Sequence, residues 1–250
     1  MDYGICPLSM VPVYQSAEVS SGWVTQLLYG EVFKIPEARK HWSRIRTPSD
    51  RCEGWVRNTQ ISSISEAEYT QLKNPDGMQI ASDLISHICT SDGLLIPIPV
   101  GASVHGASAL SHSHEGATFE AGTLKRSLVD TALLYLNSPE LKGGRSPFGI
   151  DADGLTQMVY RTMGVMLSRQ AAEQASQGSP LSFIEESEPG DLAFFDTPDG
   201  VINHVGLIMG DNYIIHCHGK VRIDRLDHTG IFNADQRRYT HPLRVIVKIL

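Results

Sequence analysis

Helical periodicity is concentrated between residues 128 and 163, and this limits the folds that the chain can adopt. Apolar side chains recur there at helical spacing in two sets, namely Leu128, Ala132, Tyr135 and Leu136, and then Leu155, Met158, Val159 and Met163. Asn137-Ser138-Pro139 is placed to end the first helix, and Gly164 to end the second. From Asp191 onward β-type runs dominate. Residues 126–250 are therefore predicted to be α+β, with helices packed on an antiparallel sheet.

The chain before residue 126 shows short β-branched and aromatic runs instead. Their roughly 8–12-residue spacing predicts a small β-barrel over residues 1–62. The segment Ser65–Lys73 is mostly polar and is expected to be a connector. The apolar run Leu94–Val100 predicts a second, irregular β module within residues 63–125, although two prolines in that run argue against a central strand. The sequence leaves open whether this region forms one barrel or two.

The charge balance restricts the possible partners. The 250 residues carry 21 Lys and Arg against 28 Asp and Glu, which gives a formal net charge of −7. A nucleic-acid-binding protein needs a basic face, so we expect no nucleic-acid partner. No apolar stretch approaches the roughly 20 residues of a membrane span. None of the four cysteines forms a CxxC pair, which argues against a zinc ribbon or a thioredoxin-type motif.

A helix start at residue 152 is the first candidate for chemistry. In the run Phe148–Leu155 a polar cap, Asp151, follows a glycine turn and opens the second predicted helix. A side chain at position 152 would project from the first turn, where backbone N–H groups and the helix dipole favour an anion. A cysteine thiolate there would have a depressed pKa and could act as a nucleophile. The residue present is Ala152.

Two histidines on successive predicted strands are the second candidate. His204 and His216 are separated by a turn at Gly210-Asp211-Asn212, so a strand and its return strand would place the two rings side by side. One ring can then serve as a base and the other can orient it. Cys217 follows His216, but neighbouring strand residues face opposite sides. We therefore expect Cys217 to face the core rather than to act as a nucleophile.

Four motifs occur in an order that resembles a known family. They are GGRSPFGIDADGL, LSRQAAEQASQG, PGDLAFF and HVGLIMGDNYIIH. Together they resemble the NlpC family of papain-like cell-wall cysteine peptidases, while VTQLLYGEVF and EGWV resemble the bacterial SH3-like domains that accompany it. The combination is similar to dipeptidyl-peptidase VI type enzymes, which cut the γ-D-glutamyl–diamino acid bond of murein peptides with a free N-terminal L-Ala.

The resemblance implies SH3-like β-barrel modules before residue 126 and a papain-like NlpC domain at residues 126–250. It also implies no cofactor and a location in the periplasm or cell envelope. The first residues, MDYGICPLSM, show no signal peptide, so we expect either that a signal was removed or that the protein is cytoplasmic. By the resemblance His204 would be the base, His216 would orient it, and Arg169 could hold the glutamyl carboxylate.

Several positions depart from the family pattern. Members typically read Asp-Cys-Ser-Gly where this chain reads Asp151-Ala152-Asp153-Gly154. Where they usually carry a tyrosine near the oxyanion site this chain has Glu140, whose carboxylate would repel a developing oxyanion. Lys142 stands at a usually aromatic position. The candidate residues on the substrate side are Glu140, Asp151, Asp153 and Arg169.

Three functions remain open at this point. A natural pseudoenzyme would explain all the departures together, and it would bind peptidoglycan stem peptides or a protein partner through the old cleft. An engineered change of the nucleophile in an active cysteine peptidase would explain Ala152 alone. Convergence of Glu140, Asp153, His204 and His216 in one cleft would instead create a zinc or iron site. With Ala152 at the nucleophile position, the chain is predicted to be inactive as a peptidase. The preferred interpretation is the pseudoenzyme, which binds no metal.

Overall fold

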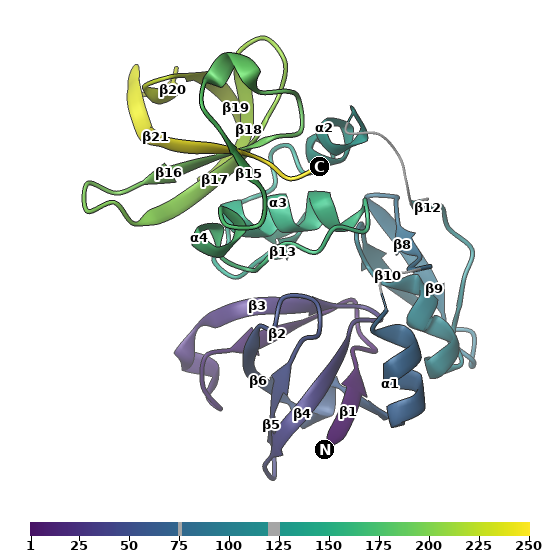
Figure 1. Ribbon diagram of the computed structural model, residues 1–250. Coiled ribbons are helices and arrows are strands. Elements are labelled where there is room, and N and C mark those ends of the chain that lie inside the picture. The colour runs from purple at the N-terminus through teal and green to yellow at the C-terminus, as the bar shows by residue number, and fades with distance from the viewer. Residues whose placement is uncertain (75–76, 120–125) are drawn as a thin grey trace. The chain divides into compact units, whose positions relative to one another are not determined.

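The computed structural model describes residues 1–74, 77–119 and 126–250 (Figure 1). These residues fall into two compact units. The first is β-rich and the second is α+β, as the sequence predicts. The first unit comprises the described residues up to 119 together with Thr162–Met166. The second comprises the described residues from 126 to 161, followed by Leu167–Leu250.

A seven-stranded antiparallel sheet dominates the first unit (Figure 1). Its strand order is β3-β2-β6-β5-β4-β1-β7. The strands are β1 (Asp2–Ile5), β2 (Met10–Tyr14), β3 (Trp23–Leu28), β4 (Val32–Ala38), β5 (Trp42–Arg46), β6 (Glu53–Arg57) and β7 (Ser62–Ile64), with short 3-10 helices at Val19–Ser21 and Asn58–Gln60. One face buries a compact apolar core that includes Val11, Val13, Leu27, Phe33, Ile45 and Val56. The predicted SH3-like β module is confirmed.

The segment expected to be a polar connector contains helix α1 (Glu66–Leu72). Ser65 and Glu68 form a capping box at its start, and Tyr69 and Leu72 are buried on its inner face. The remaining elements of this unit are β8 (Ile80–Ala81), β9 (Ile85–Cys89), β10 (Leu95–Pro99), a 3-10 helix (Val104–Leu110), β11 (Ser113–His114) and β12 (Thr118–Phe119). Strand β10, which holds the two prolines, is an edge strand of the sheet β10-β9-β11.

The second unit packs helices against a sheet that closes on itself. The strand order is β15-β21-β16-β17-β18-β19-β20, and β20 also pairs with β21, so β16 to β21 form a closed ring. The helices are α2 (Arg126–Leu133), α3 (Ala152–Arg161) and α4 (Ala171–Gln174), with a 3-10 turn at Ile184–Glu186. The strands are β13 (Arg145–Ser146), β14 (Gly149–Ile150), β15 (Ser179–Leu181), β16 (Leu192–Asp196), β17 (Ile202–Ile208), β18 (Tyr213–His218), β19 (Lys220–Asp227), β20 (Gly230–Asn233) and β21 (Arg238–Lys248).

Helix α3 lies against the strands β17 and β18 (Figure 1). Leu155, Met158 and Val159 on its predicted apolar stripe are fully buried. Their packing fixes the start of α3 beside the two strands that carry the predicted histidines. None of the helices in the described part of the chain combines the length and hydropathy that a bilayer-spanning helix requires.

Candidate functional site

The start of helix α3 is held by the side chain of Asp151. Its Oδ1 accepts from the Gly154 N–H at 2.8 Å, which is an N-cap contact, and its Oδ2 accepts from the Gly143 N–H at 2.7 Å. Arg169 Nη2 also donates to Oδ2 at 2.7 Å. Ala152 is the first residue of the helix and is largely buried. In this structure Arg169 is thus paired with Asp151, and its contact with a substrate carboxylate stays a prediction.

Asp153 links the first turn of α3 to the start of α4. Its Oδ2 accepts from the Ala171 N–H at 3.0 Å, and its backbone carbonyl accepts from Gln174 Nε2 at 3.0 Å. Burial, together with the neighbouring charge of Asp151, raises the pKa of Asp153 to about 6. The residue after the nucleophile position is therefore an acid that is ionised at neutral pH only at a cost in free energy.

We expect Asp153→Asn to stabilise the protein near pH 8 but not near pH 3.5. The folded-state pKa of about 6 lies above the ordinary 3.8, so the folded state favours the protonated acid. The loss of folding stability that ionisation causes is absent below pH 3.8. It grows as the pH rises towards about 6 and is complete above that pH. Asparagine keeps an acceptor without the charge, so the free energy of unfolding should rise by about 1–3 kcal/mol near pH 8.

Urea unfolding at the two pH values measures this difference. The exposed Asp199 provides the matched control, because Asp199→Asn removes a solvated carboxylate and should change stability little at either pH. An equal gain from Asp153→Asn at both pH values would show that its charge is not the cause.

A hydrogen-bonded series of two histidines and one carboxylate crosses the neighbouring strands β17, β18 and β19. His204 Nε2 lies 2.8 Å from His216 Nδ1, and His216 Nε2 lies 3.0 Å from Asp224 Oδ2. All three side chains are buried. Phe195 of the barrel core lies beside the His204 ring, at a centroid distance of 5.8 Å. The two rings thus lie side by side, as the strand–turn–strand pattern predicts, while their roles stay predictions.

Asp224 sets the direction of these hydrogen bonds. Burial tends to raise the pKa of Asp224, but hydrogen bonds from His216 and Arg222 outweigh it, and the pKa is lowered. An ionised carboxylate can only accept, so His216 donates its Nε2–H, and its Nδ1 accepts the Nε2–H of His204. This leaves the Nδ1 lone pair of His204 as the position that can take a proton. Burial, above all, lowers the pKa of both rings, so both are neutral near pH 7.

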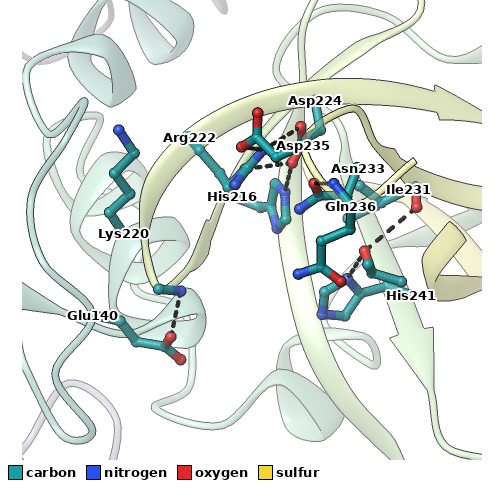
Figure 2. Close-up of polar contacts among 12 residues, drawn as sticks. Glu140, His216, Lys220, Arg222, Asp224, Ile231, Asn233, Asp235, Gln236 and His241 are labelled. Atoms are coloured by element: carbon teal, nitrogen blue, oxygen red, sulfur yellow. Dashed lines mark hydrogen bonds and ion pairs between the residues drawn. The ribbon is translucent and has the colours of Figure 1, made fainter. Parts of the chain in front are cut away.

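Sequence reasoning missed Arg222, Asp224 and His241. Arg222 binds both oxygens of Asp224, at 2.6 and 2.9 Å, and also reaches Asp235 (Figure 2). The alternation of β19 could have revealed this pair, because Arg222 lies opposite His216 in the strand register and Asp224 follows on the same face. No local pattern marks His241 of β21, whose ring stacks on that of His204 at a centroid distance of 4.0 Å.

Two further residues singled out from the sequence have structural contacts of their own. Glu140 accepts a hydrogen bond from the Gly219 N–H at 2.6 Å and is exposed (Figure 2). The Cys217 thiol donates to the Ile150 carbonyl at 3.2 Å, and burial raises its pKa to about 12. Cys217 is therefore a buried thiol with little thiolate at neutral pH, as its position on the core side of the strand predicts.

The four-residue metal ligand set that the sequence left open as an alternative is not formed by the described residues. Glu140 is held at Gly219 and Asp153 at Ala171. His204 and His216 instead group with His241, and the three offer ligand atoms that all lie within 4.8 Å of one another.

Comparisons with known proteins agree with this architecture. Residues 141–240 match the model of the NlpC/P60 family, and residues 13–61 match that of the bacterial dipeptidyl-peptidase Sh3 domain. Dipeptidyl-peptidase 6 of Lysinibacillus sphaericus is 35% identical over 87% of this chain and 89% of its own length. The γ-D-glutamyl-L-lysine dipeptidyl-peptidase of Bacillus subtilis is 24% identical over 77% of this chain and 71% of its own length. The crystal structure of an NlpC/P60 family protein from Bacillus cereus matches 99% of both chains with a TM-score of 0.78 at 14% identity, which shows a shared fold.

Proposed function

The chain belongs to the NlpC/P60 family, and on this premise we propose that it is a catalytically inactive homologue of the murein-peptide γ-D-glutamyl peptidases that binds stem peptides through the former active site. One observation carries the proposal. The ordered His204–His216–Asp224 series stands in place, while the residue at the helix start is Ala152. A methyl group cannot attack a carbonyl, so the base has no thiol to deprotonate.

The surroundings of position 152 support a natural loss of activity over an engineered one. Asp153 is the next residue, and an ionised carboxylate there would raise the pKa of any thiol at 152. Glu140, at the position where the resemblance places a tyrosine, adds a second carboxylate on the oxyanion side. A single engineered change would explain Ala152 and leave both acids unexplained.

The proposed ligand class follows from the relatives. The Bacillus subtilis relative is a γ-D-glutamyl-L-lysine dipeptidyl-peptidase, and the Lysinibacillus sphaericus relative is a dipeptidyl-peptidase. Peptides of this class carry a γ-linked D-glutamate with a free carboxylate, for which Arg169 is the proposed partner. A peptidoglycan ligand places the protein in the periplasm or the cell envelope. A protein partner that occupies the same cleft is the alternative.

Calorimetric titration with L-Ala-γ-D-Glu-diaminopimelate tests the proposal. We expect a dissociation constant in the micromolar range, which corresponds to about −8 kcal/mol. Binding should weaken at least tenfold when the amino group of the L-Ala is acetylated. No binding at millimolar peptide would overturn the proposal and would direct attention to a protein partner.

A matched pair of variants locates the binding site. Ala152→Leu places bulk at the former nucleophile position and should weaken binding at least tenfold. Val201→Leu adds a methylene at an exposed position and should leave binding unchanged. Equal effects of the two changes would show that the peptide binds elsewhere.

A further inference from the structure

We propose that His204, His216 and His241 form a binding site for a divalent transition-metal ion, with zinc as the best chemical match. The peptidase chemistry of the family needs no such ion, and the site goes beyond the proposed peptide-binding function. The three residues come from β17, β18 and β21, and closure of the sheet brings them together. They offer three imidazole nitrogens, all within 4.8 Å of one another.

The distances between the rings are close to those of a zinc site. Zn–N bonds of about 2.0–2.1 Å in a tetrahedral arrangement put ligand nitrogens about 3.4 Å apart. His204 Nε2 and His216 Nδ1 lie 2.8 Å apart, so they need only a small separation. The His241 ring stacks on His204 with an interplanar angle of 22° and must turn towards the shared centre. The ligand nitrogens already lie within 4.8 Å of one another, so the change that coordination requires is local to these side chains.

Contacts around the site orient two of the ligands. His216 gives its Nε2–H to Asp224, which is itself held by Arg222 (Figure 2). The Nδ1 lone pair of His216 therefore faces His204. A carboxylate behind a histidine is the usual support for a metal ligand. The Thr240 hydroxyl can donate to the Ile231 carbonyl at 3.5 Å and accept from His241 Nδ1 at 2.9 Å. This arrangement leaves Nε2 of His241 as its ligand nitrogen.

The hydrogen-bond pattern lets each ring present a lone pair to an ion. Neutral imidazole is the form that binds metal. The ion would replace the proton that lies between His204 and His216, and that proton would move to Nδ1 of His204. Each ring would stay neutral, and a fourth coordination position would remain for water or a ligand atom.

Among the described residues, the His218 ring also lies near His241, at a centroid distance of 5.0 Å, but it is not one of the three that offer ligand atoms within 4.8 Å of one another. His105 contacts the Leu72 carbonyl, His112 contacts the Tyr29 hydroxyl, and His114 contacts the Ser86 hydroxyl. Over the described ranges, the group on β17, β18 and β21 is the one that meets the distance requirement for three ligands.

Zinc titration of untagged, chelator-treated protein tests the inference. We expect one zinc ion per chain with a dissociation constant below one micromolar, and cobalt in its place should give the visible absorption of a tetrahedral site. His241→Phe keeps an aromatic ring but removes the ligand, and it should weaken zinc binding at least a hundredfold. His228→Phe changes an exposed histidine and should leave binding unchanged.

Two results would overturn the inference. One is a wild-type dissociation constant above about 100 micromolar, and the other is unchanged zinc affinity in His241→Phe. The cobalt spectrum of the wild-type protein decides the matter without any variant, because absence of tetrahedral absorption at saturating cobalt also overturns it. Peptide titration of metal-free protein is a separate measurement, so failure of peptide binding and failure of metal binding are distinguishable.

Discussion

Restoring the thiol by Ala152→Cys should leave hydrolysis of L-Ala-γ-D-Glu-diaminopimelate within about tenfold of the background. The proposed base is His204, whose Nε2 is engaged by His216, which leaves its Nδ1 lone pair to accept a proton. The opposing groups are Asp153, whose carboxylate follows the new thiol directly, and Glu140 on the oxyanion side. Both disfavour an anion, whether it is the thiolate or the developing oxyanion. Chromatographic detection of released L-Ala-γ-D-Glu measures the outcome.

The combined variant Ala152→Cys, Asp153→Ser, Glu140→Tyr should hydrolyse the peptide about 10²–10³-fold faster than the single variant, which is the usual effect of gaining an oxyanion donor. Adding His204→Ala to this combination should abolish the gain, because the thiol then lacks its base. Strong hydrolysis by Ala152→Cys alone would contradict the pseudoenzyme and identify the chain as a peptidase whose nucleophile had been replaced.

Removal of the Asp224 carboxylate should destabilise the protein strongly. Asp224→Ala leaves the buried Nε2–H of His216 without an acceptor and leaves Arg222, whose side chain is 17% exposed, without its main partner. Breaking a buried pair in this way costs about 3–5 kcal/mol of unfolding free energy. Denaturant unfolding near pH 7 measures the loss.

Asp235 provides the matched control for this change. It contacts the same guanidinium at 2.9 Å, but its side chain is 78% exposed. Asp235→Ala should therefore cost at most about 1 kcal/mol. Similar losses from the two changes would show that burial of Asp224 does not decide its contribution.

Local patterns were enough to predict the parts of the site that depend on neighbouring residues. A polar residue before an apolar stripe predicts the Asp151 cap, and the cap contact with Gly154 is present. A strand, a tight turn and a return strand predict that His204 and His216 are adjacent, and the register pairs Gly206 with His216. In both cases the interacting residues are close in sequence, so their geometry follows from helix and hairpin rules.

The parts that the sequence did not predict depend on long-range closure or on burial. His241 reaches His204 only because β21 pairs with both β16 and β20. Burial of Asp153 against the start of α4 raises its pKa, and no sequence spacing encodes that burial. The capping box of α1 was readable from Ser65 and Glu68, but the polar composition of the segment concealed it.

The location of the hydrogen-bonded series in the core of the barrel affects how such chains are recognised in genomes. His216 and Asp224 are buried and hydrogen-bonded to each other, so we expect their removal to destabilise the fold even when no reaction depends on them. The side chain at position 152 is a single buried methyl group at a helix start, so it contributes packing but no hydrogen bond to the fold. We therefore expect a chain of this fold to be able to lose its nucleophile while it keeps its histidines. Preserved histidines in such a sequence are evidence of an intact barrel, whereas activity is reported by position 152 together with positions 140 and 153.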